Sequence, residues 1–133
     1  MKLRTALIVS GLVLLAAGFT ATQQPKPWPV PDKAAKTANP VKSNQESIAA
    51  GKSLWGQHCG SCHGKTGKGD GNKAAQLKTP LVDFATTDYQ SQTDGTLFYK
   101  TEEGRDEMPS FKKKIPEPLD VWDIVNYTRT FKK

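Results

Sequence analysis

The chain has 133 residues, of which 36% are hydrophobic and 24% are charged. This size suits one domain with one modest core, and the composition excludes both a disordered tail and a polytopic membrane protein. The formal net charge is +6, but residues 1–43 carry +5 of it and residues 44–133 only +1. Because the larger part is nearly neutral and has no basic stripe with interleaved aromatic residues, we do not expect a nucleic-acid partner.

Residues 1–22 predict export. The chain begins with Met1-Lys-Leu-Arg, and an apolar run follows over 6–19, which is the order typical of a secretory signal. The run is shorter than the roughly 20 residues of a comfortable membrane span, so a cleaved signal peptide and an uncleaved signal anchor both stay open. In either case we expect the rest of the chain in the periplasm or on the outer face of the cytoplasmic membrane. An anchor would also associate the protein with that membrane.

Residues 23–43 have the composition of a linker. The segment contains five prolines, and proline fixes φ and removes backbone donors. We therefore expect an extended, solvated segment. Trp28 lies between two prolines and either packs on the domain or stays exposed.

The folded domain is expected over 44–133. Ordered structure is expected to begin at Ser43, because Ser43 and Glu46 have capping-box spacing. Ile48, Gly51 and Trp55 then share one face of a helix. Further helices are expected over 72–77, 96–102 and 118–131, with glycine-rich loops between them. No run alternates cleanly enough to demand a sheet, so the pattern favours an all-α fold.

The segment His58-Cys59-Gly-Ser-Cys62-His63 carries the chemistry. C-x-x-C-H is the attachment signature of c-type haem. On a helical turn the sulfurs of Cys59 and Cys62 lie on one face and can each bond to one haem vinyl group, and His63 follows as an axial ligand of the iron. A thioredoxin-type dithiol would need a βαβ setting, four zinc ligands within six residues are sterically awkward, and a disulfide across two residues would be strained. The segment therefore predicts one covalently attached haem c.

The second axial ligand can be sought by elimination. His58 sits on the proximal side beside the attachment site, and Met1 belongs to the export segment. Met108 remains, and the following Pro109 biases it toward the extended backbone of a loop. Alternatives are that Met108 fills a gap in the core, that a lysine such as Lys112 binds instead, or that the site is open. We expect Met108 to be the ligand.

Methionine ligation points to a function. A neutral thioether raises the reduction potential relative to a second histidine, and an iron with six ligands has no open position for a substrate. We therefore expect an electron carrier that is not an enzyme. The alternatives are a haem enzyme or a gas or redox sensor with a labile distal ligand, and a structural or dithiol protein without haem.

Six motifs in order resemble one family. They are Gly51-x-x-x-Trp55, Cys59-x-x-Cys62-His63-Gly64, Gly67-x-Gly69-Asp70-Gly71, Pro80-x-x-x-Phe84, Met108-Pro109-x-Phe111 and Trp122-x-Ile124-Val125-x-Tyr127-x-Arg129. Residues 47–131 thus resemble a class I cytochrome c domain of the small single-haem bacterial type.

The resemblance implies an all-α fold of three to five helices around one covalent haem c. It implies that the first and last helices cross closely at Gly51, and that the carbonyl of Pro80 accepts a hydrogen bond from the second nitrogen of His63. It also implies other redox proteins as electron donor and acceptor. The lysines expected near the haem edge either steer an acidic partner or form a solvated rim; they are Lys65, Lys68 and Lys112 to Lys114. Candidate pocket walls are Leu81, Phe84, Leu97, Phe98 and Phe111.

Overall fold

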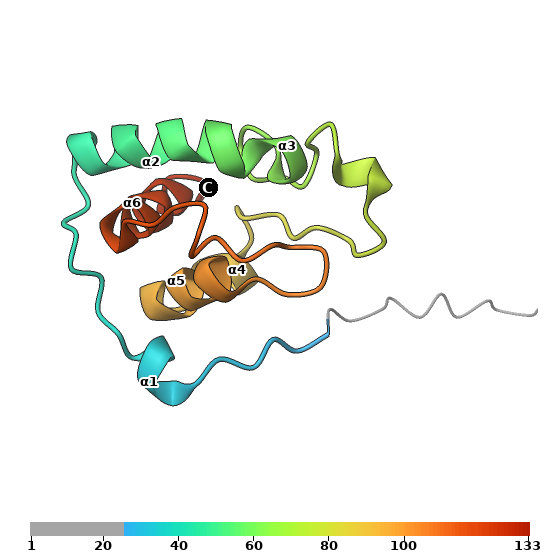
Figure 1. The fold of residues 1–133 in the computed structure, drawn as a ribbon. Coiled ribbons are helices and arrows are strands. Elements are labelled where there is room, and N and C mark those ends of the chain that lie inside the picture. The colour runs from blue at the N-terminus through green and yellow to red at the C-terminus, as the bar shows by residue number, and fades with distance from the viewer. Residues whose placement is uncertain (1–25) are drawn as a thin grey trace, which may run out of the picture.

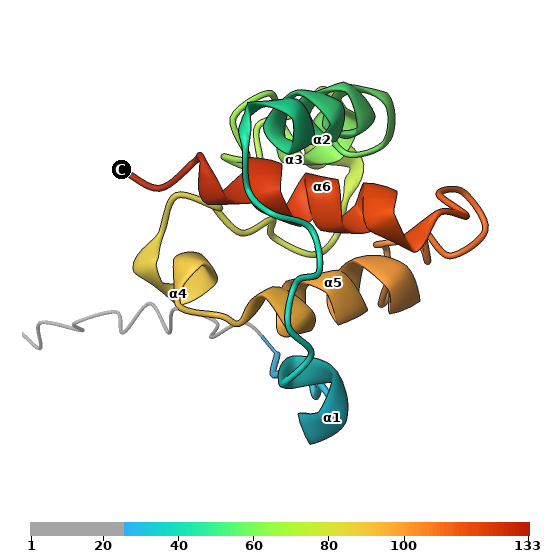
Figure 2. The same ribbon diagram turned by 90° about the vertical axis from the view of Figure 1, so that its left-hand side faces the viewer.

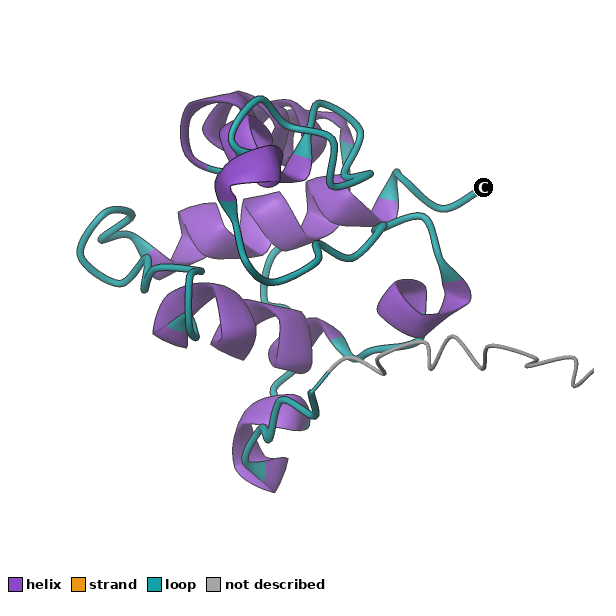
Figure 3. Ribbon diagram, turned by 90° about the vertical axis from the view of Figure 1, so that its right-hand side faces the viewer, coloured by secondary structure: helices purple, strands orange, loops and turns teal. Residues whose placement is uncertain are grey.

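The computed structural model describes residues 26–133, and the export segment predicted over 1–22 lies outside the described residues. In chain order the helices are α1 (Asp32–Ala35), α2 (Gln45–His58), α3 (Gly60–His63), the 3₁₀ helix η1 (Ala74–Gln76), α4 (Thr87–Gln90), α5 (Asp94–Glu103) and α6 (Pro118–Arg129). Figure 3 shows only helices and loops in this part of the chain, which confirms the all-α prediction. Five of the α-helices fall within 44–133, as expected. Across residues 26–133, none of these helices combines the length and the apolar character that a membrane span requires.

The start of α2 differs from the prediction by one residue. The N-cap is Asn44, in an extended conformation, and its side-chain oxygen accepts a hydrogen bond of 2.9 Å from the backbone N–H of Ser47. Asparagine and serine are comparably good N-caps, so spacing alone could not choose between neighbouring residues. The capping box at Ser43 and Glu46 is therefore wrong.

Helices α2 and α6 cross closely at Gly51. A Cβ at this position would overlap the backbone carbonyl of Asp123 and approach the Cβ of Tyr127 to 2.9 Å, so only glycine lets the two backbones come this near. Trp55 and Ile124 pack in the same buried cluster next to the crossing. The close crossing that the resemblance implied is confirmed, and it fixes the direction in which α2 carries the haem-attachment segment.

Helix α6 lies between α2 on one side and α5 on the other (Figures 1 and 2). On the α5 side, the rings of Phe98 and Trp122 stack at 4.1 Å. Arg129, at the end of α6, forms an ion pair of 2.6 Å with Asp94 and donates to the carbonyl of Gln92 at 2.6 Å. These contacts join α6 to the start of α5, so the three long helices form one framework around the site.

The segment expected to be a solvated linker is packed on the domain from residue 26 onward, which corrects that expectation. Figure 1 shows it passing below α5, turning through α1 and rising to α2. Asn39 donates to the side chain of Asn126 at 2.8 Å, and Thr93 donates to the carbonyl of Ala35 at 2.6 Å. Prolines lower the conformational entropy that docking removes, so a proline-rich segment can bind a surface as readily as it can stay free. Trp28 is half-buried against the domain.

Candidate haem-binding site

The two cysteines and the histidine lie in one turn at the end of α2. Cys59 ends α2 and starts α3; its N–H bonds to the Trp55 carbonyl at 2.9 Å, and its carbonyl accepts from the N–H of His63 at 2.9 Å. Both cysteines are free thiols, with Cys59 buried and Cys62 half-buried. This is the predicted helical turn, in which residues three apart share a face.

The Cys59 thiol does not have the properties of a redox-active cysteine. Burial, together with the charge of Cys62, raises the pKa of Cys59 to about 12. A thiol with this pKa is protonated at neutral pH, whereas reactive dithiols depend on the thiolate. The helical surroundings also differ from the βαβ setting of such proteins. Within residues 26–133, no group of three or more His, Cys, Asp or Glu side chains is placed to hold a metal ion.

His63 has the environment of a neutral imidazole. Burial lowers its pKa, and its ring lies 4.9 Å from that of Phe84 and 5.8 Å from that of Trp55. Its Nδ1 is buried and has no hydrogen-bond partner in the described part of the chain. A neutral imidazole is the form that binds a metal, so the residue fits an axial ligand.

The hydrogen bond predicted from His63 to the Pro80 carbonyl is not formed in this structure. Pro80 is exposed. The chain before it is held elsewhere, because the backbone N–H groups of Lys78 and Thr79 both donate to the carboxylate of Glu107 at 2.9 Å. Glu107, next to Met108 in sequence, thus holds the start of this loop.

Met108 lies at the end of a tight turn. The N–H of Arg105 donates to the Met108 carbonyl at 2.8 Å, and the N–H of Met108 donates to the Arg105 carbonyl at 2.9 Å. Met108 is half-buried and packs on the same hydrophobic cluster as Cys59 and Phe111. The structure therefore brings the proposed distal ligand and the attachment site, far apart in sequence, to one cluster.

The rival ligands are less well placed. The ammonium group of Lys112 forms an ion pair with the carboxylate of Glu103, and half of its side chain is exposed. His58 is half-buried with its ring edge against Phe111, at 6.2 Å between centroids. The Lys112 ammonium group is thus engaged by Glu103, and the His58 ring contacts the cluster from the turn that precedes Cys59.

The residues predicted to form the walls are apolar and mostly aromatic, as a flat hydrophobic macrocycle would require. Of the predicted wall residues, Leu97 and Phe111 are buried, and Phe84 and Phe98 are partly buried against the core. Leu81 is half-buried. The core cluster and its margin also include Leu54, Ile115 and Phe131, which were not predicted as walls.

Sequence reasoning also missed Arg105 and Glu107, which organise the chain around Met108. Both are charged residues in a loop, and such residues usually face solvent. Their partners lie 78 and 28 residues away in sequence, so no local pattern could have found them.

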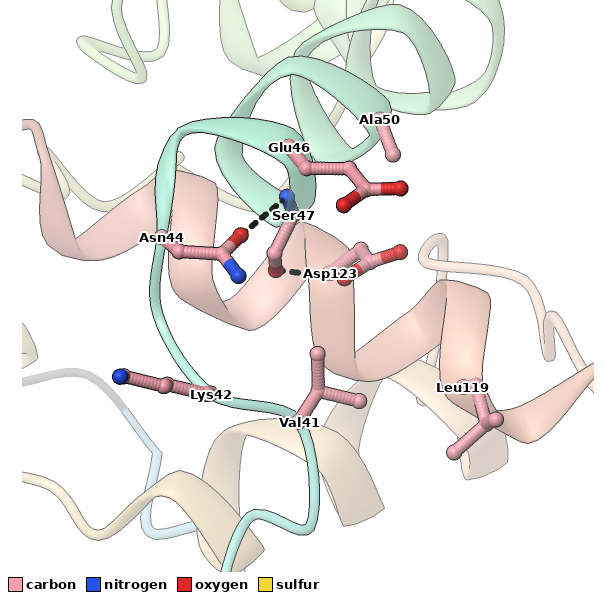
Figure 4. A pocket seen from close by; sticks show the side chains of 8 residues that line it. All are labelled: Val41, Lys42, Asn44, Glu46, Ser47, Ala50, Leu119 and Asp123. Carbon is pink, nitrogen blue, oxygen red and sulfur yellow. Dashed lines mark hydrogen bonds between the residues drawn. The ribbon is translucent and has the colours of Figure 1, made fainter.

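A separate depression of about 290 Å³ lies at the opposite end of α2. Figure 4 shows its lining, in which Asn44 and Asp123 bond to Ser47. The 14 residues of α2 span roughly 20 Å at 1.5 Å per residue, so this depression is distant from Cys59. None of the predicted site residues lines it.

The helical fold and the attachment turn together define a class I c-type cytochrome. Residues 46–127 match the family described as "Cytochrome C oxidase, cbb3-type, subunit III", and the chain belongs to this family. As a member it binds haem c covalently and serves haem-based electron transfer.

Solved structures agree with this assignment. The "KustC0563 c-type cytochrome" is 33% identical with a TM-score of 0.55, and the match covers 62% of this chain and 98% of that one. A chain of the "Kuenenia stuttgartiensis reducing HAO-like protein complex Kustc0457/Kustc0458" has a TM-score of 0.63 at 23% identity, covering 81% of this chain and 52% of that one, and this likeness concerns the fold alone. "Quinohemoprotein alcohol dehydrogenase ADH IIB" of Pseudomonas putida is 45% identical over 42 residues, which are 32% of this chain and 6% of that protein.

Proposed function

We propose that the protein is a single-electron carrier whose haem iron is bound by His63 and Met108, and that it is not an enzyme. One observation carries the proposal. Cys59, Cys62 and His63 lie in one helical turn, and Met108, from a distant loop, packs on the same cluster as Cys59. This arrangement offers one ligand from each of two separate segments.

Each residue has a distinct task in this proposal. When bound, the haem supplies reversible one-electron chemistry at its iron. Cys59 and Cys62 tether it beside α3, and His63 presents a neutral imidazole. Met108 contributes a soft thioether that favours the reduced state. The surrounding apolar side chains keep water out, which also favours the less charged state.

Carbon monoxide tests the ligation. With both axial positions taken by the chain, the reduced protein at neutral pH is expected not to bind carbon monoxide, whereas the Met108→Ala variant is expected to bind it rapidly and stoichiometrically. Rapid binding by the unaltered protein would instead support a haem enzyme or gas sensor with a labile distal ligand. The variant should keep its covalent haem and have a lower reduction potential.

We propose other redox proteins as electron donor and acceptor. The local match to a quinohemoprotein supports a redox protein as neighbour. Lys65, Lys68 and Lys113 are exposed and could steer an acidic partner. The rate of electron transfer with the physiological partner should then fall as ionic strength rises; a rate independent of salt would mean that these lysines are a solvated rim.

We propose the periplasm, or the outer face of the cytoplasmic membrane, as the place of action. The support is the basic and apolar start of the chain. Sequencing the N-terminus of the mature protein from fractionated cells distinguishes cleavage from retention as an anchor. Recovery of the uncleaved protein from the cytosol would contradict export.

A further inference from the structure

Residues 26–31, which we name the strap, lie against the turn that carries Met108. The guanidinium group of Arg105 donates to the carbonyl of Pro27 at 2.7 Å and to that of Lys26 at 3.2 Å. Its Cζ also lies 4.5 Å from the centre of the Trp28 ring. Arg105 therefore contacts the strap by two hydrogen bonds and one cation–π interaction.

Arg105 also closes the turn at Met108. Its backbone N–H and carbonyl make both hydrogen bonds to Met108, at 2.8 and 2.9 Å. Between them, Asp106 has a φ of 52°, in a region that costs a non-glycine residue free energy. A short turn with such a residue opens easily unless its surroundings hold it. The side chain of Arg105 supplies such a hold, since it is only 26% exposed.

The strap is itself fixed to a rigid element. The ammonium group of Lys100, on α5, lies 5.5 Å from the centre of the Trp28 ring. Trp28 thus contacts a helix of the framework through Lys100 and the Met108 turn through Arg105. The alternating prolines of the strap reduce the entropy lost on docking, and a guanidinium group stacks well on an indole ring.

We propose that the strap keeps Met108 in its ligating position, with Trp28 and Arg105 as positioning residues for the distal ligand. The inference rests on the proposed ligation by Met108. The strap limits how often the turn opens, and so how often the thioether leaves the iron. The proline-rich segment is then a working part of the electron-transfer site.

The test uses the full-length protein with haem attached. The rate of carbon monoxide binding to the reduced protein measures how often Met108 leaves, and the weak long-wavelength absorption band of a ferric iron–thioether bond reports its presence. Trp28→Ala and Arg105→Gln are expected to raise the carbon monoxide rate on the order of tenfold, the size expected from losing a cation–π interaction and its neighbouring hydrogen bonds. Trp28→Phe keeps an aromatic ring and should raise the rate less than Trp28→Ala.

Asn39→Ala is the matched control. It loosens the same N-terminal segment where Asn39 bonds to Asn126, without touching Arg105. It should lower the thermal midpoint while leaving the carbon monoxide rate and the thioether band unchanged.

The outcomes separate the two proposals. Faster binding in Trp28→Ala and Arg105→Gln but not in Asn39→Ala supports the strap. Equal rates in all variants, with the thioether band present, overturn the strap and leave Met108 ligation intact. Equal acceleration in Asn39→Ala also overturns it, because general loosening would then be the cause. Absence of the thioether band from the unaltered protein contradicts Met108 ligation itself, and the strap proposal falls with it.

Discussion

The two sides of the haem site are built in different ways. The proximal side, with Cys59, Cys62 and His63, is one helical turn that continues from α2, and its geometry follows from five consecutive residues. The distal side, with Met108, is a loop whose position depends on contacts from the strap, from α5 and from the loop before Pro80. The difference teaches that the attachment of the haem is a local property of the chain, whereas the position of Met108, the proposed second ligand, depends on the whole fold.

The largest effect is expected from removing the proximal attachment. In the double variant Cys59→Ala and Cys62→Ala, the haem is no longer tethered, and the aromatic and aliphatic walls lose the surface on which they pack. We expect a chain without a cooperative unfolding transition by circular dichroism. A sharp transition near that of the unaltered holoprotein would show that the core does not need the cofactor.

The α2–α6 crossing supports the proximal side, and Gly51→Ala should weaken it. The added Cβ overlaps the carbonyl of Asp123, so the helices must move apart, at a cost of about 2–3 kcal/mol in unfolding free energy. Gly56→Ala in the same helix is the control, since a Cβ there meets nothing within 4 Å. Gly56→Ala should stabilise the protein by up to about 1 kcal/mol, because alanine favours the helix more than glycine does. Similar losses in both variants would contradict this account, because a Cβ at Gly56 meets nothing and the loss could not then come from the crossing. Denaturant unfolding of the two variants measures both changes in the free energy of unfolding.

On the distal side, Gly104→Ala should separate ligation from attachment. Gly104 has a φ of 66°, and a Cβ there would overlap the backbone of Pro109. The variant must therefore displace Met108 while the proximal turn stays unchanged. We expect covalent haem at the normal yield, a weakened thioether band and faster carbon monoxide binding, with a loss of stability of about 1–2 kcal/mol. An unchanged thioether band would mean that the loop tolerates the displacement.

The smallest effect concerns pH and the core behind His63. Burial raises the pKa of Tyr89 above its usual value of 10.0, and its ring stacks on Phe84 at 3.9 Å. The neutral phenol is therefore the form that the fold favours. Its contribution to stability is complete below pH 10 and is lost as the pH rises from there toward the higher pKa of the folded state. Tyr89→Phe should lose less stability than the unaltered protein between pH 9 and 11, as measured by urea unfolding; parallel curves would contradict this.

The same contrast explains what the sequence could predict. The attachment turn and the helices predicted over 96–102 and 118–131 follow from patterns within a few residues, and the structure has helices over 94–103 and 118–129. The Gly51 crossing was implied by the family resemblance and is also present. Met108 could be proposed only by elimination. The docking of residues 26–43 could not be predicted, because proline content describes stiffness and not the surface that a segment meets.

The error at the start of α2 has a tertiary origin. Asn44 and Ser43 are both competent N-caps, and only the tertiary position of α2 decides between them. The hydrogen bond from His63 to the Pro80 carbonyl stays a prediction for the protein with haem attached. The contact of Glu107 with Thr79, 28 positions away in sequence, could not be predicted. Long-range polar contacts of exposed residues leave no periodic signal in a sequence.

The central claim is that the chain holds a haem covalently through Cys59 and Cys62. Mass spectrometry of the denatured, protease-digested mature protein tests it most directly. The peptide containing both cysteines is expected to carry the mass of one haem and to resist alkylation at both sulfurs. A peptide without porphyrin mass and with two alkylated cysteines, from a host able to attach haem, would contradict the account.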